Sequence, residues 1–91
     1  MPDILITRAH SLGLDGARQA AADMAERLRR DFGVTTRHDG DTVWVEGRGV
    51  TGRLDAGPDE VRVEAQLGLA ARPFRRRLRR EIETELDRLT L

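Results

Sequence analysis

A run of arginines close to the C-terminus forms the densest concentration of charge in this chain of 91 residues. The planar guanidinium group binds phosphate and carboxylate through paired hydrogen bonds, so a cluster of arginines indicates an anionic partner. The run from Arg75 to Arg80 contains no aromatic residue, which argues against single-stranded nucleic acid, whose bases need stacking platforms. The candidate residues of this arginine cluster are Arg72, Arg75, Arg76, Arg77, Arg79 and Arg80.

The charges of this segment run in the opposite order to the one that a helix dipole favours. The arginines come first and four acids follow between residues 81 and 87, although acids stabilise a helix at its N-terminus by about 0.3–1 kcal/mol each. The pairs Arg77–Glu81 and Arg79–Glu83 would contribute only about 0.2–0.5 kcal/mol each. This order predicts an anionic partner: phospholipid head groups, nucleic-acid phosphate or an acidic patch of a protein. The alternative is a solvated face whose arginine stems pack over the sheet edge.

Trp44, the only tryptophan, is the second candidate contact. In an extended strand Val43 and Val45 share one face, and Trp44 points to the other. If the valines face the helices, Trp44 lies on the open face of the sheet, near Leu5, and could contact a partner or a second copy. If the valines face outward, Trp44 fills a core that is short of aromatic residues. The sequence leaves both interpretations open.

No group of residues has the spacing of an active site or a metal site. His10 and His38 do not form a helical pair of ligands. Asp39 and Asp41 beside His38 are residues that a hairpin turn favours, and Ser11 after His10 is better explained as a helix cap than as a nucleophile. We therefore expect no catalytic residue, no metal and no cofactor, and a protein that is not an enzyme.

The overall composition narrows the class of protein further. Sixteen arginines balance sixteen acids, and lysine is absent, so the molecule as a whole is not a dedicated polyanion binder. The absence of cysteine excludes disulfides, thiolate metal sites and a cysteine nucleophile. The N-terminus lacks the pattern of a signal peptide, and no apolar run approaches the roughly 20 residues that cross a bilayer. We expect a cytoplasmic protein with no transmembrane segment.

The first third of the chain predicts a short strand and a long helix. The strand covers residues 3–8, and the helix ends at Phe32, with Gly33 as the residue that terminates it. Ser11 or Asp15 is expected to cap its N-terminus. Apolar residues at steps of three and four predict one buried stripe along the helix, formed by Leu14, Ala17, Ala21, Met24, Ala25, Leu28 and Phe32.

The remainder predicts an antiparallel meander followed by a second helix. The expected turns are Asp39-Gly40, 47–49 and 55–59, which separate strands at 34–38, 42–46, 50–54 and 61–67. The last helix begins near residues 71–73, because proline is tolerated in a first turn, and its apolar stripe is Phe74, Leu78, Ile82, Leu86 and Leu89.

The order β-α-β-β-β-β-α predicts a single α+β domain over residues 1–91. Two amphipathic helices and a sheet with one apolar face make a two-layer sandwich, with both helices on the same face of an antiparallel sheet.

Four segments in consistent order along nearly the whole chain resemble the polyhydroxyalkanoic acid system family: 10–14 (HSLGL), 17–18 (AR), 49–52 (GVTG) and 67–74 (LGLAARPF). This family consists of small bacterial proteins encoded near genes for polyhydroxyalkanoate storage granules. The resemblance implies a cytoplasmic protein that acts on or near granules of hydrophobic polyester. It carries over no activity and no catalytic residue.

Three hypotheses for the function follow. The first is a non-enzymatic accessory or binding protein of polyhydroxyalkanoate metabolism, associated with the granule surface or granule proteins and homodimeric through the open sheet face. The second is a small carrier domain that holds an apolar or acyl ligand between the sheet and the helix at 12–32. The third is anion or nucleic-acid binding through Arg72–Arg80, although the zero net charge argues against nucleic acid.

Overall fold

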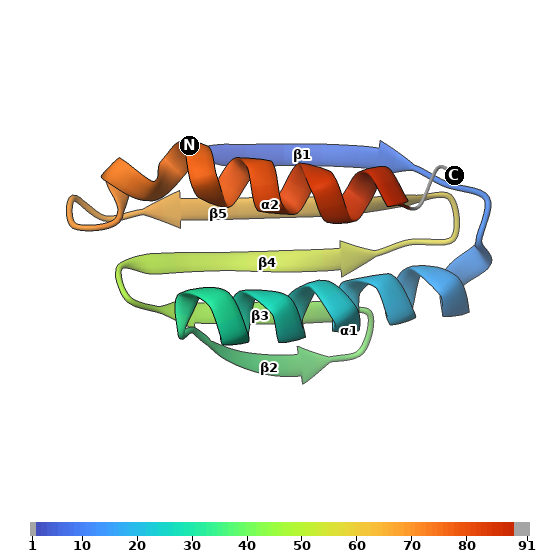
Figure 1. Cartoon of the computed structure of the whole chain (residues 1–91). Helices are drawn as coiled ribbons and strands as arrows, with labels where there is room; N and C mark the ends of the chain where they lie inside the picture. The colour runs from blue at the N-terminus through green and yellow to red at the C-terminus, as the bar shows by residue number, and fades with distance from the viewer. Residues whose placement is uncertain (1, 89–91) are drawn as a thin grey trace.

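A computed structural model describes residues 2–88 and has the element order that the sequence predicts (Figure 1). Strand β1 (Ile4–Ala9) leads into helix α1 (Gly13–Phe32), which is followed by four consecutive strands. These strands are β2 (Thr35–Asp39), β3 (Thr42–Gly47), β4 (Val50–Ala56) and β5 (Glu60–Leu67). A single 3-10 turn, η1 (Arg72–Phe74), then leads into helix α2 (Arg75–Asp87).

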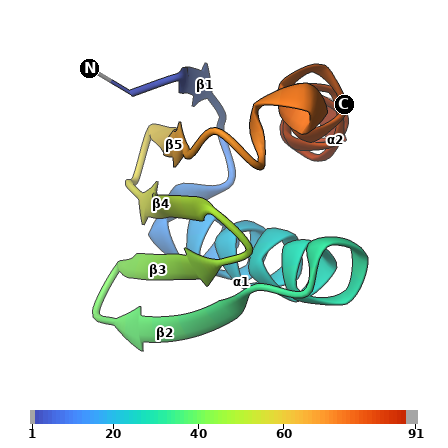
Figure 2. The same ribbon diagram turned by 90° about the vertical axis from the view of Figure 1, so that its left-hand side faces the viewer.

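The five strands form one antiparallel sheet in the order β1-β5-β4-β3-β2. The N-terminal strand β1 therefore lies at one edge of the sheet, beside the last strand β5. Helix α1 carries the chain across to β2 at the opposite edge. Figure 2 shows both helices on one side of the sheet, while its other face has no helix. The predicted α+β two-layer sandwich is confirmed.

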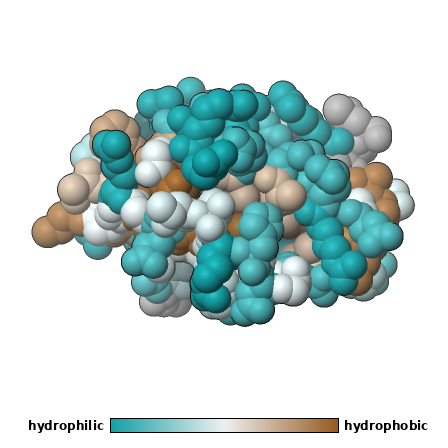
Figure 3. Space-filling view, turned by 90° about the horizontal axis from the view of Figure 1, so that it is seen from below, coloured by the Kyte–Doolittle hydropathy of each residue, from teal (hydrophilic) through white to brown (hydrophobic). Residues whose placement is uncertain are grey.

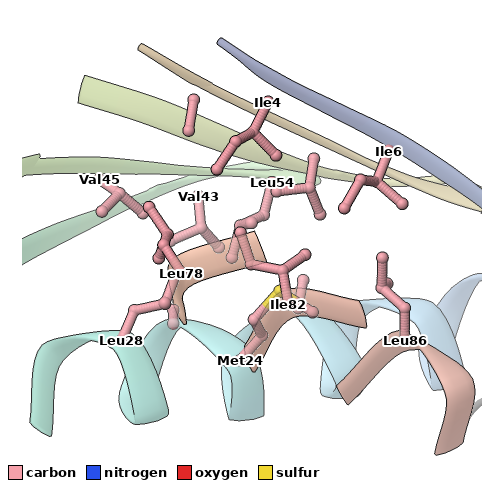
Figure 4. Close-up of a cluster of buried hydrophobic side chains, with 14 of the residues drawn as sticks. Ile4, Ile6, Met24, Leu28, Val43, Val45, Leu54, Leu78, Ile82 and Leu86 are labelled. Carbon is pink, nitrogen blue, oxygen red and sulfur yellow. The ribbon is translucent and has the colours of Figure 1, made fainter. Parts of the chain in front are cut away.

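The core lies between the sheet and the two helices. Figure 4 shows strand residues such as Ile4, Val43 and Leu54 pointing toward Met24 of α1 and Ile82 of α2. In β5 the predicted alternation is observed, because Val61, Val63, Ala65 and Leu67 are buried on one face. Full burial of one such aliphatic side chain stabilises the fold by about 1.5–3 kcal/mol. The contacts between this face of the sheet and the buried residues of α1 and α2 therefore hold both helices on the sheet.

The ends of α1 differ from each other in how well the sequence predicts them. Gly33 ends the helix as expected, with a φ of 67° and its N–H donating to the carbonyl of Arg29 at 3.0 Å. The expected caps at Ser11 and Asp15 are wrong, because Leu12 is the capping position and its own side chain makes no capping hydrogen bond. His10 supplies the missing acceptor, since its Nδ1 receives the N–H of Leu12 at 3.1 Å.

The first hairpin turn lies one residue later than predicted. Asp39 pairs with Thr42, so Gly40 and Asp41 are the central residues, and only Gly40 has a positive φ (61°). One glycine at the first central position is sufficient for a two-residue hairpin turn, which is why Asp39 is free to extend β2. The second turn falls at Arg48-Gly49 as expected, and the third is shortened to 57–59 because β4 and β5 are longer than predicted.

The predicted helix start at 71–73 falls on the 3-10 turn η1, which contains Pro73, and α2 itself begins later, at Arg75. Leu78, Ile82 and Leu86 are buried as expected. Phe74 is not part of this stripe, because it is 53% exposed; it belongs to the 3-10 turn, whose different pitch rotates it away from the core. Leu89 lies outside the described residues. Within residues 2–88 no helix is long and apolar enough to cross a membrane.

Candidate partner-binding surface

The arginine cluster lies on the exposed surface of η1 and the first two turns of α2. All six of its residues are exposed, and Leu78 between them is buried and anchors the helix. An open hollow of about 500 Å³ is lined by Pro73 and by four members of the cluster, namely Arg72, Arg75, Arg76 and Arg79. Four guanidinium-bearing side chains around one hollow make this the most concentrated positive surface among the described residues.

Most arginines of the cluster have no carboxylate partner. Arg79 pairs with Glu83 at 3.1 Å, as predicted, whereas Arg77 lies over the ring of Phe32 at 5.2 Å. Across residues 2–88 no carboxylate forms an ion pair with Arg72, Arg75, Arg76, Arg77 or Arg80. The expected Arg77–Glu81 pair is therefore absent, and five positive charges remain available to an anionic partner.

Two of the four acids of α2, Glu81 and Glu85, are held by the other helix. Arg27 of α1 lies 3.1 Å from Glu81 and 2.8 Å from Glu85. The hydrogen bond to Glu81, followed by the charge of Glu85, raises the pKa of Arg27 above its ordinary value. The positions of Glu81 and Glu85 are thus explained by ion pairs with α1, whereas the one contact described between an arginine of the first half and α1 is that of Arg77 with the ring of Phe32.

An apolar tip, which we define as residues 68–74, adjoins the cluster. Leu69 is 83% exposed and Phe74 is 53% exposed, and Figure 3 shows hydrophobic residues protruding at the end of the molecule where β5 joins η1. Backbone bonds hold this connection: the N–H of Gly68 donates to Gly49 at 2.8 Å, and the N–H of Ala71 donates to Gly68 at 3.0 Å. The tip is therefore a fixed corner that presents apolar and cationic groups together.

Trp44 lies on a different surface. Val43 and Val45 are buried under the helices, so Trp44 points to the open face of the sheet and is 37% exposed. Arg37 and Arg53 flank its ring, each at 5.9 Å. The structure does not bring Trp44 together with the arginine cluster, because the cluster belongs to the helix layer on the other side of the sheet (Figure 2).

The expected neighbourhood of Trp44 and Leu5 is wrong. The two residues do share a cross-strand row, because Leu5 pairs with Glu64, Glu64 with Arg53, and Arg53 with Trp44. Two strands nevertheless lie between them, which at about 4.8 Å per strand separates the two backbones by roughly 14 Å. The row between them is polar, since Arg53 lies 3.6 Å from Glu64.

The residues considered for catalysis have structural contacts. Nε2 of His10 lies 3.0 Å from the carbonyl oxygen of Gly57, while Nδ1 accepts the N–H of Leu12. His10 thereby joins the start of α1 to the turn between β4 and β5. Within residues 2–88 no group of three or more candidate ligands gathers that could hold a metal ion.

The interior offers little space for a ligand. The apolar cavity between the helices and the sheet, lined by residues such as Leu28, Gly52 and Ile82, has a volume of about 20 Å³. That volume accommodates about one water molecule, so the fold does not support the predicted carrier of an acyl ligand.

Arg48 is a residue that the sequence pattern alone did not single out. It occupies the first central position of the turn between β3 and β4 with a φ of 54°, the only described residue other than glycine with a positive φ. This conformation favours glycine or asparagine. The available signal was an arginine between two glycines, Gly47 and Gly49, in a predicted tight turn.

These features define a small antiparallel α+β sandwich in which an apolar tip adjoins an arginine cluster. The chain belongs to the family described as "Putative polyhydroxyalkanoic acid system protein", which it matches over residues 4–89. The family resemblance of the sequence is thereby confirmed, together with the link to polyhydroxyalkanoate systems. No curated protein and no solved structure matches the chain.

Proposed function

We propose that the protein is a non-enzymatic accessory protein of polyhydroxyalkanoate storage, located in the bacterial cytoplasm, which docks on the granule surface through its tip. The observation that carries this proposal is the fixed corner at residues 68–74, where the exposed side chains of Leu69 and Phe74 adjoin arginines without carboxylate partners. Membership of the polyhydroxyalkanoic acid system family supports the granule as the setting.

The chemistry of the tip suits the boundary between an apolar phase and water. Leu69 gains up to about 1.5–3 kcal/mol if it leaves water completely, and Phe74, which is already half buried, gains a smaller amount. Arginines beside them remain at the boundary, where each contributes about 1 kcal/mol next to an anionic surface. A dissociation constant of 1 μM requires about 8 kcal/mol, which neither the apolar contacts nor the charges supply alone, so firm docking requires both.

A homodimer through the open sheet face is a separate proposal. Trp44 offers exposed apolar area there, but ion pairs such as Arg53–Asp55 at 3.0 Å and Arg62–Glu64 at 2.6 Å cover the surface beside it. A stable interface buries about 800 Å² on each partner, so a dimer would have to cover these pairs as well as Trp44.

Anion or nucleic-acid binding through Arg72–Arg80 is the second candidate function, favoured by the unpaired arginines of the cluster. It differs from granule docking in its salt dependence. Binding to nucleic acid through several phosphates falls steeply with salt, whereas docking through Leu69 and Phe74 retains its apolar part. A fluorescently labelled single strand and a duplex, titrated at low and high salt, test it, and absence of binding at low salt eliminates it.

Co-sedimentation with isolated polyhydroxyalkanoate granules tests the main proposal. Reversing the charges of Arg75, Arg76 and Arg77 to glutamate should greatly reduce the protein found with the granules. Trp44→Ala should leave that fraction unchanged, because Trp44 lies on the other side of the sheet from the cluster. If the wild-type protein is no more enriched with granules than an unrelated control protein, granule docking is wrong.

A further inference from the structure

A groove separate from the arginine hollow lies beside the start of α2. Its volume is about 250 Å³, and it runs between the end of α1, the start of β4 and the 3-10 turn η1. Its walls are apolar, formed by Phe32, Val50, Leu67, Ala71, Phe74 and Leu78. The charged side chains that line it are Arg48, Arg77 and Asp31.

Arg48 occupies its position in the groove at a conformational cost. Left-handed backbone angles are strained for a residue with a side chain, and glycine would remove that strain at a φ of 54°. The side chain lies across Gly33, because a Cβ atom built there would be 3.2 Å from Nε of Arg48. Strain at a residue that lines a pocket is a reason to ask what its side chain binds.

The positive charges of the groove exceed its negative charge. Neither Arg48 nor Arg77 forms an ion pair with any carboxylate of residues 2–88. Asp31 is already engaged, since it lies 3.7 Å from both Arg27 and Arg30 of its own helix. Arg77 also covers the ring of Phe32, so one guanidinium group adjoins the apolar wall directly.

We propose that this groove binds a monocarboxylate with a short apolar chain, with its carboxylate at Arg48 and Arg77 and its chain against Phe32 and Leu78. Charge complementarity selects the anion, because two unpaired arginines match a carboxylate through paired hydrogen bonds. The apolar walls select a chain over a fully charged ion such as phosphate, which would leave them uncovered. This proposal does not rest on granule docking, because the isolated protein and a free acid are sufficient to test it.

Hexanoate is the probe, titrated into the ¹⁵N-labelled protein and followed by the amide NMR shifts. A ligand this small is expected to bind with a dissociation constant on the order of 1 mM. The shifts should centre on Gly33, Gly49 and Ala71, which surround the groove, and not on Gly40 at the far hairpin. Acetate lacks the chain, hexan-1-ol lacks the charge and inorganic phosphate lacks both chain and planar shape, so each should bind at least about tenfold more weakly.

Three variants test whether hexanoate binding depends on Arg48 and Arg77 rather than on the positive charge of the surface in general. Arg48→Gly and Arg77→Gln should each weaken hexanoate about tenfold or more, because each loses a charged hydrogen bond. Arg48→Gly also removes the backbone strain of the turn, so a loss of binding in this variant does not result from a loss of folding. Arg29→Gln, which removes the same charge from an exposed residue of α1 that does not line the groove, should bind as the wild type does. The proposal is overturned if wild-type shifts are absent or lie elsewhere, if phosphate binds as well as hexanoate, or if all three variants bind equally.

Discussion

Nη1 of Arg27 on α1 lies 2.8 Å from Oε1 of Glu85 on α2. Together with the bond from Arg27 to Glu81 at 3.1 Å, this contact joins the two helices outside the apolar core. It uses the acids of α2 and leaves the preceding arginines without partners from their own helix, apart from Arg79. The charge order of α2 thus has one structural cause in the positions of Glu81 and Glu85, which serve contact between the helices.

Replacing Arg27 by glutamine should lower the melting temperature by a few degrees, because Glu81 loses its ion pair with α1 and Glu85 keeps only the longer contact with Arg88 at 3.5 Å. The pKa of Arg27 is raised above its ordinary value by the hydrogen bond to Glu81 and the charge of Glu85, so its contribution is fully present from neutral pH up to that ordinary value and is lost only as the pH rises through the folded pKa. The difference between variant and wild type should therefore stay constant from pH 6 to pH 10, as measured by circular dichroism.

The matched control is Arg29→Gln, whose partner Glu26 lies on the same exposed helix surface at 2.8 Å. Pairs of that kind are worth little, so this variant should melt close to the wild type. Equal melting temperatures for both variants would mean that Arg27 does not hold the helices together.

Gly52→Ala should destabilise the sheet by about 1–3 kcal/mol, the range typical of overpacking. A Cβ atom at residue 52 would lie 2.5 Å from the carbonyl oxygen of Glu64 on β5, so the two strands would have to separate. In a domain of this size each kcal/mol lowers the melting temperature by roughly 4–8 °C. Thr51→Ala, on the same strand but exposed, should change it far less, and urea denaturation of both variants checks the difference.

Trp44 should report any contact through the open face of the sheet. In the monomer its ring is partly exposed between Arg37 and Arg53, so its fluorescence should not be strongly blue-shifted. If the sheet face forms a homodimer, the emission should shift to the blue as the concentration rises, and Trp44→Asp should abolish the dimer in sedimentation velocity. A dimer that persists in that variant would have to use another surface.

The elements of this fold follow from the sequence where one strong local pattern decides them. The stripe of α1, the ending at Gly33 and the alternation of β5 each depend on residues close together in the chain, so periodicity predicts them. The cap of α1 was missed because the acceptor is the ring of His10, whose orientation depends on Gly57, 47 residues away.

The sequence predicts the charges of the candidate surface but not the contacts that its residues make. The arginine cluster is visible in the sequence, but the capture of Glu81 by Arg27 is a contact between two helices that no spacing along α2 indicates. Phe74 fits the apolar period of the last helix, and only the 3-10 geometry of η1 exposes it. The strained Arg48 is recognised from its φ, which the sequence does not state.

Granule docking through the tip is tested most directly by comparing two exposed leucines at opposite ends of the molecule. Leu69 lies in the tip and is 83% exposed, whereas Leu12 is 49% exposed at the start of α1, where aspartate is a favourable cap. In co-sedimentation with isolated granules, we predict that Leu69→Asp greatly reduces the bound fraction and that Leu12→Asp binds as the wild type does. Equal binding of the wild type and Leu69→Asp would contradict it.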